Sequence, residues 1–544
     1  MSLRPPPGFR GVFRDDPNAR AVYSEAAGIA RILPHAVAVP ADIDDLVTLV
    51  RDSALTRTAL IPRGSGSGMP GGAIGDGVIV DLSRWRHIGD VNVSSRGIRV
   101  GPGAIRADVD RVARTHGLRL PVDPSSGAFC TIGGMASTNA AGAHSMHFGS
   151  MRHWVRAIDC VFADGTRAEV RRGDSRAADH RGLDRFVSLA RQLSDAASGA
   201  VPVHAGVLKD SSGYAVAGYA CSGDLVDLLV GSEGTLAFFV ELELALAPLA
   251  AATSSVLGAF ATIEAAVIAA GRARDAGATA CELLDRTFLD VAASGGAPRS
   301  VPAGTESALL VEVEGRDADA AAAAARAIEA IFRDAGATTA RIALDPATET
   351  ALWELRHAAS PILSRLDPDL RSMQFIEDGA VPPAKLPAYV RGIREILSAN
   401  DTPGVIFGHA GDAHVHVNPL VDVSRSDWRQ RVERVLDSAV ALTASLDGTL
   451  TGEHGDGRLR TPLLSRVWPA RALEDFRAVK LAFDPVGILN PGVKIALPEQ
   501  SPLTDIKYDR ELTPLPPPAR QALDFVERER GYARFRLDLL NARQ

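Results

Sequence analysis

The feature that most constrains this chain is a glycine-dense loop near its N-terminus, PRGSGSGMPGGA at residues 62–73. Gly66, Gly68 and Gly71 match the spacing of a dinucleotide fingerprint, which requires a helix to begin inside the motif. Pro70 stands in the loop instead, and a strand pattern follows it. No lysine of the chain follows a glycine, so a Walker-type phosphate loop is also excluded. The sequence therefore predicts a tight turn between two strands, either an anion nest suited to a pyrophosphate or a glycine-rich hairpin loop without a ligand.

The composition is that of a globular protein, and we expect a small-molecule site. The 544 residues are 46% hydrophobic and 23% charged, which is enough for two or more domains with cores. There are 59 basic and 66 acidic residues, a net charge of −7, and no block of like charges suggests nucleic acid or a polybasic membrane patch. We expect a cytoplasmic protein with no integral membrane segment and leave peripheral membrane contact open. Four widely spaced cysteines predict neither a disulfide framework nor a cysteine-ligated metal centre: Cys130, Cys160, Cys221 and Cys281.

The predicted secondary structure divides the chain into parts of different character. Residues 36–62 read as strand, helix and strand, with an aspartate at the helix cap. The run AIDCVFADGTRAEV reads as a hairpin that turns at Asp164 and Gly165. From residue 251 to about 345, two successive strand–helix–strand units predict a ferredoxin-like half-sandwich, with coincidental alternation as the alternative. The proline-rich TPLPPPAR around residue 513 predicts a tail or linker.

Two further runs favour a bound ligand at the glycine loop. Residues 120–166 are dense in small side chains, and Gly133 and Gly134 allow a backbone to approach a planar ligand. Serine, threonine and asparagine in the same run supply neutral hydrogen bonds suited to an isoalloxazine edge. VGSEGTLAFFVE, from Val230, adds another turn flanked by glycines. Together these runs favour the anion nest over a glycine-rich hairpin loop without a ligand.

Histidines cluster in the second half of the chain. IFGHAGDAHVHVNP places His409, His414 and His416 within eight residues, and the last two share a strand face because side chains alternate with period two. Neutral imidazoles suit a divalent ion such as zinc or manganese. GTLTGEHGDGR adds adjacent Glu453 and His454, and neither metalloprotease spacing is present. Three histidines in eight residues, of thirteen in the chain, favour a metal site over histidines that only pack.

These glycine-rich and histidine-rich runs together resemble the vanillyl-alcohol-oxidase-like superfamily, in its branch of FAD-linked 2-hydroxy-acid dehydrogenases and oxidases. That branch includes D-lactate dehydrogenase, the glycolate oxidase flavin subunit and D-2-hydroxyglutarate dehydrogenase. The resemblance covers roughly residues 20–500, and FIEDGAVPP, CTIGGM, AHSMHFG and GEHGDGR look closest to large members fused to an iron–sulfur part. No cluster-binding cysteines follow here. The resemblance therefore implies a separate electron acceptor: an iron–sulfur protein, a quinone, a carrier or O2.

The resemblance implies FAD as the cofactor. Relatives with covalent FAD carry a histidine in the glycine loop where this chain has Ser67, so we expect non-covalent binding. Asn490 matches a C-terminal signature that folds back onto the flavin domain, with an ordinary Asn-Pro turn as the alternative. The residues implied to hold the pyrophosphate, to line the flavin and to close the adenine end are Arg63, Gly64, Ser65, Gly66, Ser67, Gly68, Asp123, Ser126, Gly133, Gly134, Asn139, Gly142, Glu233, Gly234 and Asn490.

The resemblance also implies the catalytic groups. It places His409, His416 and Glu453 on the metal and makes His454 the general base. Arg356, in the W-x-x-R pattern of ALWELRHAAS, is implied to bind the substrate carboxylate; without the resemblance it would read as an arginine on an exposed helix face.

Three positions depart from the family pattern. His414 stands where asparagine is usual and Ala413 where glycine is usual, so His414 either replaces or supplements His416 as a ligand. Glu377 precedes Asp378 where several relatives have a lysine. An acidic residue there argues against a preference for dicarboxylates such as 2-hydroxyglutarate.

The resemblance implies an α+β fold. An FAD-binding domain of the vanillyl-alcohol-oxidase type, with two subdomains, is expected at residues 1–248, and a ferredoxin-like α/β substrate (cap) domain at 249–430. Residues 431–500 are expected to return to the flavin domain and complete the active site, and 501–544 to form the tail or linker.

The predicted function is FAD-dependent oxidation of a small 2-hydroxy acid to the 2-oxo acid. The resemblance favours a D-enantiomer such as D-lactate, glycolate or D-2-hydroxyglutarate. The metal lowers the pKa of the substrate hydroxyl, a histidine takes the proton, and the hydride goes to the flavin. Two alternatives are a metal-independent flavin oxidase of sugars or alcohols and a non-catalytic flavoprotein subunit that transfers electrons. A homodimer is left open.

Overall fold

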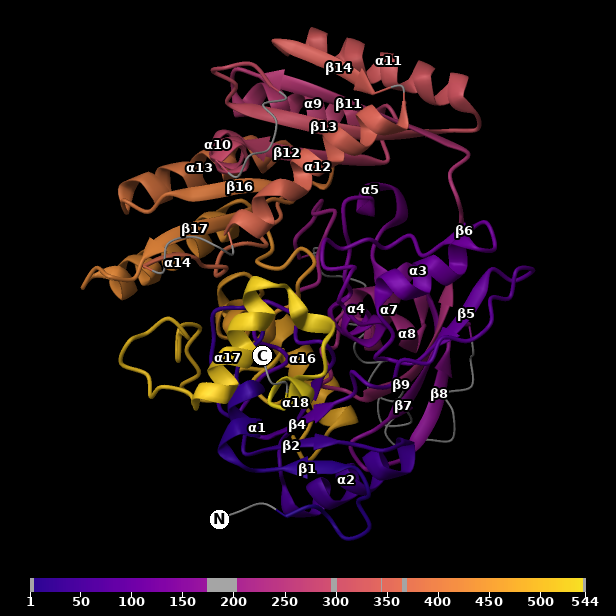
Figure 1. Ribbon diagram of the computed structural model, residues 1–544, viewed down its shortest axis with the longest axis vertical. Helices are drawn as coiled ribbons and strands as arrows, with labels where there is room; N and C mark the ends of the chain where they lie inside the picture. The colour runs from indigo at the N-terminus through magenta and orange to yellow at the C-terminus, as the bar shows by residue number, and fades with distance from the viewer. Residues whose placement is uncertain (1–3, 174–202, 295–300, 344, 364–368, 542–544) are drawn as a thin grey trace.

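The computed structural model describes residues 4–173, 203–294, 301–343, 345–363 and 369–541. Two four-stranded sheets lie toward one end of the long axis and a seven-stranded sheet lies toward the other (Figure 1). None of the helices in these ranges is long and apolar enough to cross a membrane. The mixed helix-and-strand fold expected from the sequence is confirmed.

The first sheet carries the glycine loop. Residues 36–62 form the predicted strand, helix and strand, and the Asp42 carboxylate caps helix α2 (Ile43–Thr56). Strands β3 (Leu60–Arg63) and β4 (Val78–Asp81), on either side of the loop, run parallel, so the loop is not the turn of a hairpin. The sheet order is β1 (Val12–Arg14), β2 (Ala36–Val39), β4 (Val78–Asp81) and β3 (Leu60–Arg63).

The second sheet is antiparallel and shares a core with the first. The predicted hairpin at Asp164 and Gly165 joins β7 to β8, and Val161 and Phe238 pack with α2 and the first sheet. The sheet order is β5 (Gly97–Val100), β9 (Phe238–Ala245), β7 (Val155–Val161) and β8 (Arg167–Arg171). Around it lie α3 (Arg106–Arg114), α4 (Ile132–Thr138), α5 (Ser145–Phe148), α7 (Val216–Ser222), α8 (Leu225–Leu229) and the short pair β6 (Leu118–Arg119) and β10 (Ala247–Pro248).

The seven-stranded sheet begins as the predicted ferredoxin-like unit. Its first four strands follow the order β14-β11-β13-β12 with every neighbour antiparallel, and β16, β17 and β15 extend the sheet. The strands are β11 (Ala252–Phe260), β12 (Ala280–Asp285), β13 (Ser307–Gly315), β14 (Thr339–Ala343), β15 (Leu370–Ser372), β16 (Gly404–His409) and β17 (His416–Asp422).

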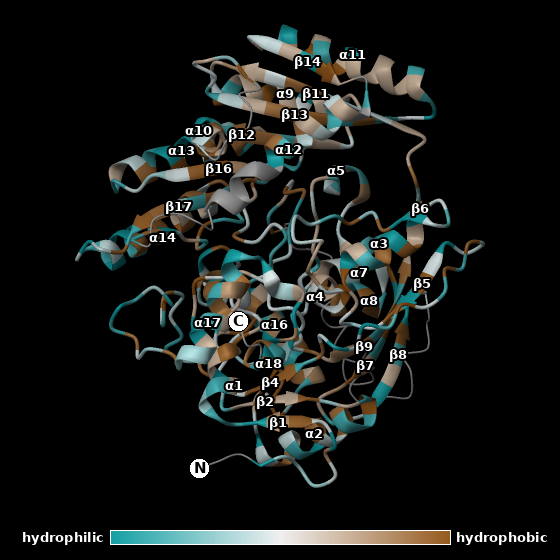
Figure 2. Cartoon of the chain, in the orientation of Figure 1, coloured by the Kyte–Doolittle hydropathy of each residue, from teal (hydrophilic) through white to brown (hydrophobic). Residues whose placement is uncertain are grey.

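Both faces of this sheet are covered because apolar side chains alternate along its strands. Val256 packs toward one core and Leu257 toward the other, as expected from the period of two. Brown apolar segments accordingly follow the strands between the helices (Figure 2). One face is covered by α9 (Ile263–Asp275), α11 (Ala318–Asp334), α13 (Leu386–Ala399) and α14 (Trp428–Ser445), and the other by α10 (Arg286–Ser294) and α12 (Pro346–Leu363).

The C-terminal quarter returns to the two N-terminal sheets after α14. Helices α15 (Gly457–Arg460) and α16 (Ala470–Phe483) follow, and Phe476 and Phe483 of α16 join the core of the second sheet. The expectation of a tail or linker beyond residue 500 is corrected: α17 (Pro517–Arg528) packs against α1 (Pro17–Val22), near α18 (Arg536–Leu539) (Figure 1). The proline-rich run supplies the start of α17, since proline is tolerated in the first turn of a helix. Residues 542–544 lie outside the described ranges.

Asp484 fixes the turn that leads from α16 back to the first sheet. Its buried carboxylate accepts hydrogen bonds from the backbone N–H groups of Gly487 (2.8 Å) and Leu489 (2.7 Å) and from Lys480 Nζ (2.6 Å). We expect Asp484→Ala to lower the free energy of unfolding by about 3–5 kcal/mol, because it leaves a buried ammonium group unpaired. Chemical denaturation measures this. Glu474→Ala, at an exposed position of α16, is the control and should change stability by less than about 1 kcal/mol; an equal effect of both would contradict the assignment.

Candidate active site

The site consists of two adjoining cavities. The first, of about 190 Å³, is lined by the glycine loop, by segments within residues 124–141 and by segments within 233–239. The second, of about 430 Å³, opens between this region and the seven-stranded sheet. The walls meet at residues that line both cavities: Ser67, Met69, Ser125, Ser126, Glu453 and His454.

The loop's shape depends on a buried arginine beneath it. The Arg63 guanidinium donates to the backbone carbonyls of Tyr23 (3.2 Å), Glu25 (2.9 Å) and Ala73 (3.1 Å). Gly66 has a φ of +70°, and an added Cβ would lie 2.4 Å from Arg63 Nη2. Arg63 therefore holds the loop in place through its side chain, and the residue also lines the first cavity.

The other expected cofactor residues fall into two groups. Eight line the first cavity, five of them in the glycine loop and three in the segment at residues 126–134: Gly64, Ser65, Gly66, Ser67, Gly68, Ser126, Gly133 and Gly134. Glu233 and Gly234 also line it, and the Glu233 carboxylate accepts from the backbone N–H groups of Asp456 (2.6 Å) and Gly457 (2.9 Å). Glu233 thus ties the C-terminal segment to the flavin part.

Four expected cofactor residues do not line the first cavity. Asp123 lines the second cavity and bonds to His144 Nδ1 at 2.6 Å. Asn139 accepts from the backbone of Arg152, and Gly142 packs so closely on Asp123 that an added Cβ would lie 2.4 Å from its backbone. Asn490 donates to the carbonyls of Gly72 and Glu233. These residues hold the cavity walls in position, because their polar or close contacts are with the protein itself.

The histidine cluster forms where β16 and β17 leave the sheet. His409, His414, His416 and Glu453 are buried, and each offers a ligand atom within 4.8 Å of the others. His409 Nε2 lies 3.3 Å and His416 Nε2 3.4 Å from the same oxygen, Glu453 Oε1. Two imidazole nitrogens and a carboxylate thus converge on one point.

The opposite nitrogens of these two rings are already oriented. His409 Nδ1 lies 2.5 Å from Glu282 Oε1, and His416 Nδ1 lies 3.0 Å from the Glu377 carbonyl oxygen. A metal-ligating histidine usually donates its other N–H to a carboxylate or a backbone carbonyl, as both do here. The donor set therefore fits a divalent ion such as zinc.

His414 belongs to the same cluster but faces other partners. Its Nε2 lies 2.9 Å from Asp378 Oδ1, and its Nδ1 lies 3.4 Å from Lys209 Nζ. Burial and the Lys209 charge lower the pKa of His414 to about 3. Lys209 was not predicted from the sequence, where a single lysine in VLKDSSGY carries no recognisable motif; its Nζ lies 2.7 Å from Glu453 Oε2.

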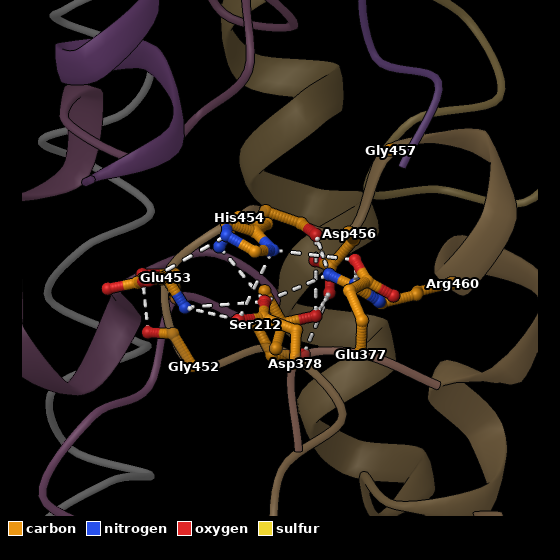
Figure 3. Close-up of polar contacts among 12 residues, drawn as sticks. Ser212, Glu377, Asp378, Gly452, Glu453, His454, Asp456, Gly457 and Arg460 are labelled. Carbon is orange, nitrogen blue, oxygen red and sulfur yellow. Dashed lines mark hydrogen bonds and ion pairs between the residues drawn. The ribbon is translucent and has the colours of Figure 1, made fainter. Parts of the chain in front are cut away.

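His454 stands beside this cluster and is oriented by acidic groups (Figure 3). Its Nδ1 lies 3.4 Å from Glu377 Oε1 and its Nε2 lies 3.7 Å from Glu453 Oε1. Burial opposes protonation, but the charges of Asp378 and Glu377 raise the pKa of His454 above its usual value. Arg460 pairs with both carboxylates and so offsets part of their negative charge.

Arg356 lines the second cavity, as expected of a residue that binds the substrate carboxylate, but part of its charge is already neutralised. Its Nε donates to Glu282 Oε2 at 2.5 Å, and its guanidinium lies over the Phe407 ring. Glu282 joins Arg356 to His409, a connection that sequence spacing does not reveal because the three residues come from α12, β12 and β16.

Comparisons with known proteins agree with this architecture. Residues 34–171 match the model of an FAD binding domain, and residues 249–493 match the C-terminal domain of FAD linked oxidases. The chain is 30% identical over 495 residues to glycolate oxidase subunit GlcD of Bacillus subtilis (strain 168), covering 89% of this chain and 94% of that protein. It is 28% identical over 519 residues to D-2-hydroxyglutarate dehydrogenase of Pseudomonas putida, covering 90% of this chain and 51% of that protein.

The fold also matches solved structures. A complex of 4-ethylphenol oxidase from Gulosibacter chungangensis superposes with a TM-score of 0.64 at 14% identity, covering 90% of this chain and 94% of that chain. The fold and the cavity at the glycine loop define a flavoprotein oxidoreductase. The chain belongs to the FAD-linked oxidase family, and its cofactor is FAD.

Proposed function

We propose that this enzyme oxidises a small 2-hydroxy acid, as the D-enantiomer where the acid is chiral, to the corresponding 2-oxo acid. The observation that carries the proposal is that Glu453 and His454 line both cavities. A substrate carbon at this junction has the flavin cavity on one side and the histidine cluster on the other. Relatives named for glycolate and D-2-hydroxyglutarate support the same class of reaction.

The cluster fits a divalent metal ion, zinc or manganese, held by His409, His416 and Glu453; His414 does not replace His416, because its ring nitrogens face Asp378 and Lys209. When bound, FAD supplies the hydride acceptor and the metal ion lowers the pKa of the substrate hydroxyl. Zinc is favoured by the mixture of imidazole and carboxylate ligands.

His454 takes the proton of the substrate hydroxyl. Its Nδ1 is turned toward Glu377, and its Nε2 faces Glu453 Oε1 at 3.7 Å, at the junction of the two cavities. Arg356 binds the substrate carboxylate with the guanidinium N–H groups that do not contact Glu282, and Glu282 holds it in place. A positioned base of this kind contributes about 10²–10⁴-fold in rate.

FAD is proposed to bind non-covalently, with its pyrophosphate on the backbone N–H groups of the glycine loop. The loop residues that line the cavity include Ser65 and Ser67 and no histidine, the residue that relatives with covalent FAD carry in this loop. Precipitation of the protein should release the flavin into the supernatant. Flavin that remains in the washed precipitate would contradict this.

Electrons are proposed to leave through a separate acceptor in the cytoplasm: an iron–sulfur protein, a quinone, a carrier or O2. The test of the proposed function supplies an artificial dye as acceptor and screens D- and L-2-hydroxy acids while trapping 2-oxo acid as its hydrazone. We expect dye reduction and 2-oxo acid in equal amounts for one enantiomer. Oxidation of sugars or simple alcohols without any hydroxy-acid activity would overturn the proposal.

A further inference from the structure

The C-terminal segment, residues 505–541, forms one wall of the second cavity. Tyr508, Glu527, Arg530 and Tyr532 all line it. The segment is held there by α17 against α1 and by a hydrogen bond from the Lys507 N–H to the flavin part at 2.8 Å. The two family models end at residues 171 and 493, so this wall lies outside the part that they match.

Every carboxylate that lines this cavity already has a cationic partner. His144 lies within 2.8 Å of both Asp123 and Glu312, and the four others pair with a lysine or arginine elsewhere. These four pairs are Glu282 with Arg356, Glu377 with Arg460, Glu453 with Lys209, and Glu527 with Lys507. Each of these carboxylates is therefore engaged by a basic group of the protein, with His144 shared by Asp123 and Glu312 and Arg460 shared by Glu377 and Asp378. Glu377 in particular is held by Arg460, which it shares with Asp378, and by His454, so its buried carboxylate is turned to protein groups rather than to a substrate.

Two arginines of the same cavity have no acidic partner. Arg371, on β15, and Arg530, in the C-terminal segment, have no carboxylate within 4 Å among the described residues, and both line the cavity. Their guanidinium groups lie over aromatic rings, 5.1 Å from the centroid of Tyr508 and 5.0 Å from that of Phe129. The Arg371 Nε is buried without a hydrogen-bond partner.

We propose that Arg530 and Arg371 are specificity-determining residues that bind a second anionic group of the substrate, so that this enzyme prefers 2-hydroxy dicarboxylic acids to 2-hydroxy monocarboxylic acids. Two guanidinium groups that line one cavity, stacked on rings and without acidic partners, match a carboxylate in charge and in hydrogen-bonding geometry. The inference rests on the proposed oxidation of a 2-hydroxy acid, in which Arg356 takes the carboxylate next to the reacting carbon.

The test compares two acids of equal length, D-2-hydroxyglutarate and D-2-hydroxyvalerate, which differ in one terminal carboxylate. Flavin reduction is followed without oxygen in the wild type and in Arg530→Ala, Arg530→Gln and Arg371→Ala. We expect each variant to weaken binding of the dicarboxylate by about 30- to 100-fold, the effect of a lost charge-assisted contact, and to change the monocarboxylate by less than about 3-fold. Arg534→Ala, at an exposed position of the same segment, should change neither acid.

A second measurement does not require turnover. The dissociation constants of 2-oxoglutarate and 2-oxovalerate are obtained from the shift of the flavin absorbance that each causes, with flavin content and thermal midpoint confirming that each variant is folded. Equal losses for both acids, or no loss for the dicarboxylate, would overturn the arginine assignment. Failure of every 2-hydroxy acid to reduce the flavin refutes the proposed function instead, so the two failures are distinguishable.

Discussion

Replacing His454 by glutamine should lower the rate of flavin reduction by substrate about 10²–10⁴-fold, while FAD stays bound. Glutamine keeps a polar side chain of similar length but cannot accept and hold a proton at neutral pH. The backbone N–H of His454 donates to Asp378 Oδ2 at 2.9 Å. Because the substitution leaves this hydrogen bond in place, the local fold should be preserved. Stopped-flow reduction without oxygen, with flavin content measured beside it, tests this.

His116→Gln is the matched control, because His116 is exposed at the end of α3 and contacts only its own helix terminus. It should reduce its flavin at the wild-type rate. A His454→Gln enzyme that retains FAD and more than one tenth of the wild-type rate would show that another group takes the proton.

Replacing Glu453 by glutamine should remove the bound metal ion and, with it, substrate-dependent flavin reduction. The only carboxylate among the four clustered ligand candidates would be lost, and the Lys209 ammonium beside it would lose the nearer of its two anionic partners, Glu453 and Asp412. Substitution of a group that only hydrogen-bonds to a metal ligand lowers the affinity for the metal about 10–100-fold. Loss of a direct ligand should lower that affinity at least as much. Elemental analysis should find about one equivalent of metal in the wild type and less than about 0.1 in the variant.

Glu354→Gln is the control, because it makes the same substitution at an exposed position of α12, outside the histidine cluster. This variant should retain metal and activity. Because Glu453→Gln leaves a lysine buried, its thermal midpoint is measured as well. Full flavin reduction by a metal-free Glu453→Gln enzyme would show that the cluster has no part in the reaction.

Much of the fold follows from local pattern. The strand–helix–strand opening, the hairpin at Asp164 and Gly165, and the ferredoxin-like unit are encoded by periodicity and by turn residues, so the sequence predicts them. The extension of the ferredoxin-like sheet by β15, β16 and β17 is a long-range pairing that no local pattern specifies. The docking of α17 on α1 is of the same kind, since it joins residues about 500 positions apart and the proline-rich run alone predicts a linker.

The part of the site that could be predicted is the part whose residues come from short, recognisable motifs. His409, His416, Glu453 and His454 come from two motifs and meet in space. The role of the Arg63 guanidinium could not be predicted, because the sequence shows that an arginine precedes the loop but not that its side chain turns beneath it. Lys209, Glu282 and Arg530 were missed for a related reason, since each becomes informative only through partners on other elements.

The most direct test of the central claim is bleaching of the bound flavin without oxygen by D- and L-2-hydroxy acids, with and without a divalent metal chelator. We predict that one enantiomer bleaches the flavin completely, that the chelator prevents bleaching, and that zinc or manganese restores it. Flavin that no hydroxy acid reduces after metal is restored would contradict the assigned reaction. Bleaching that the chelator leaves unchanged would contradict the assigned metal site.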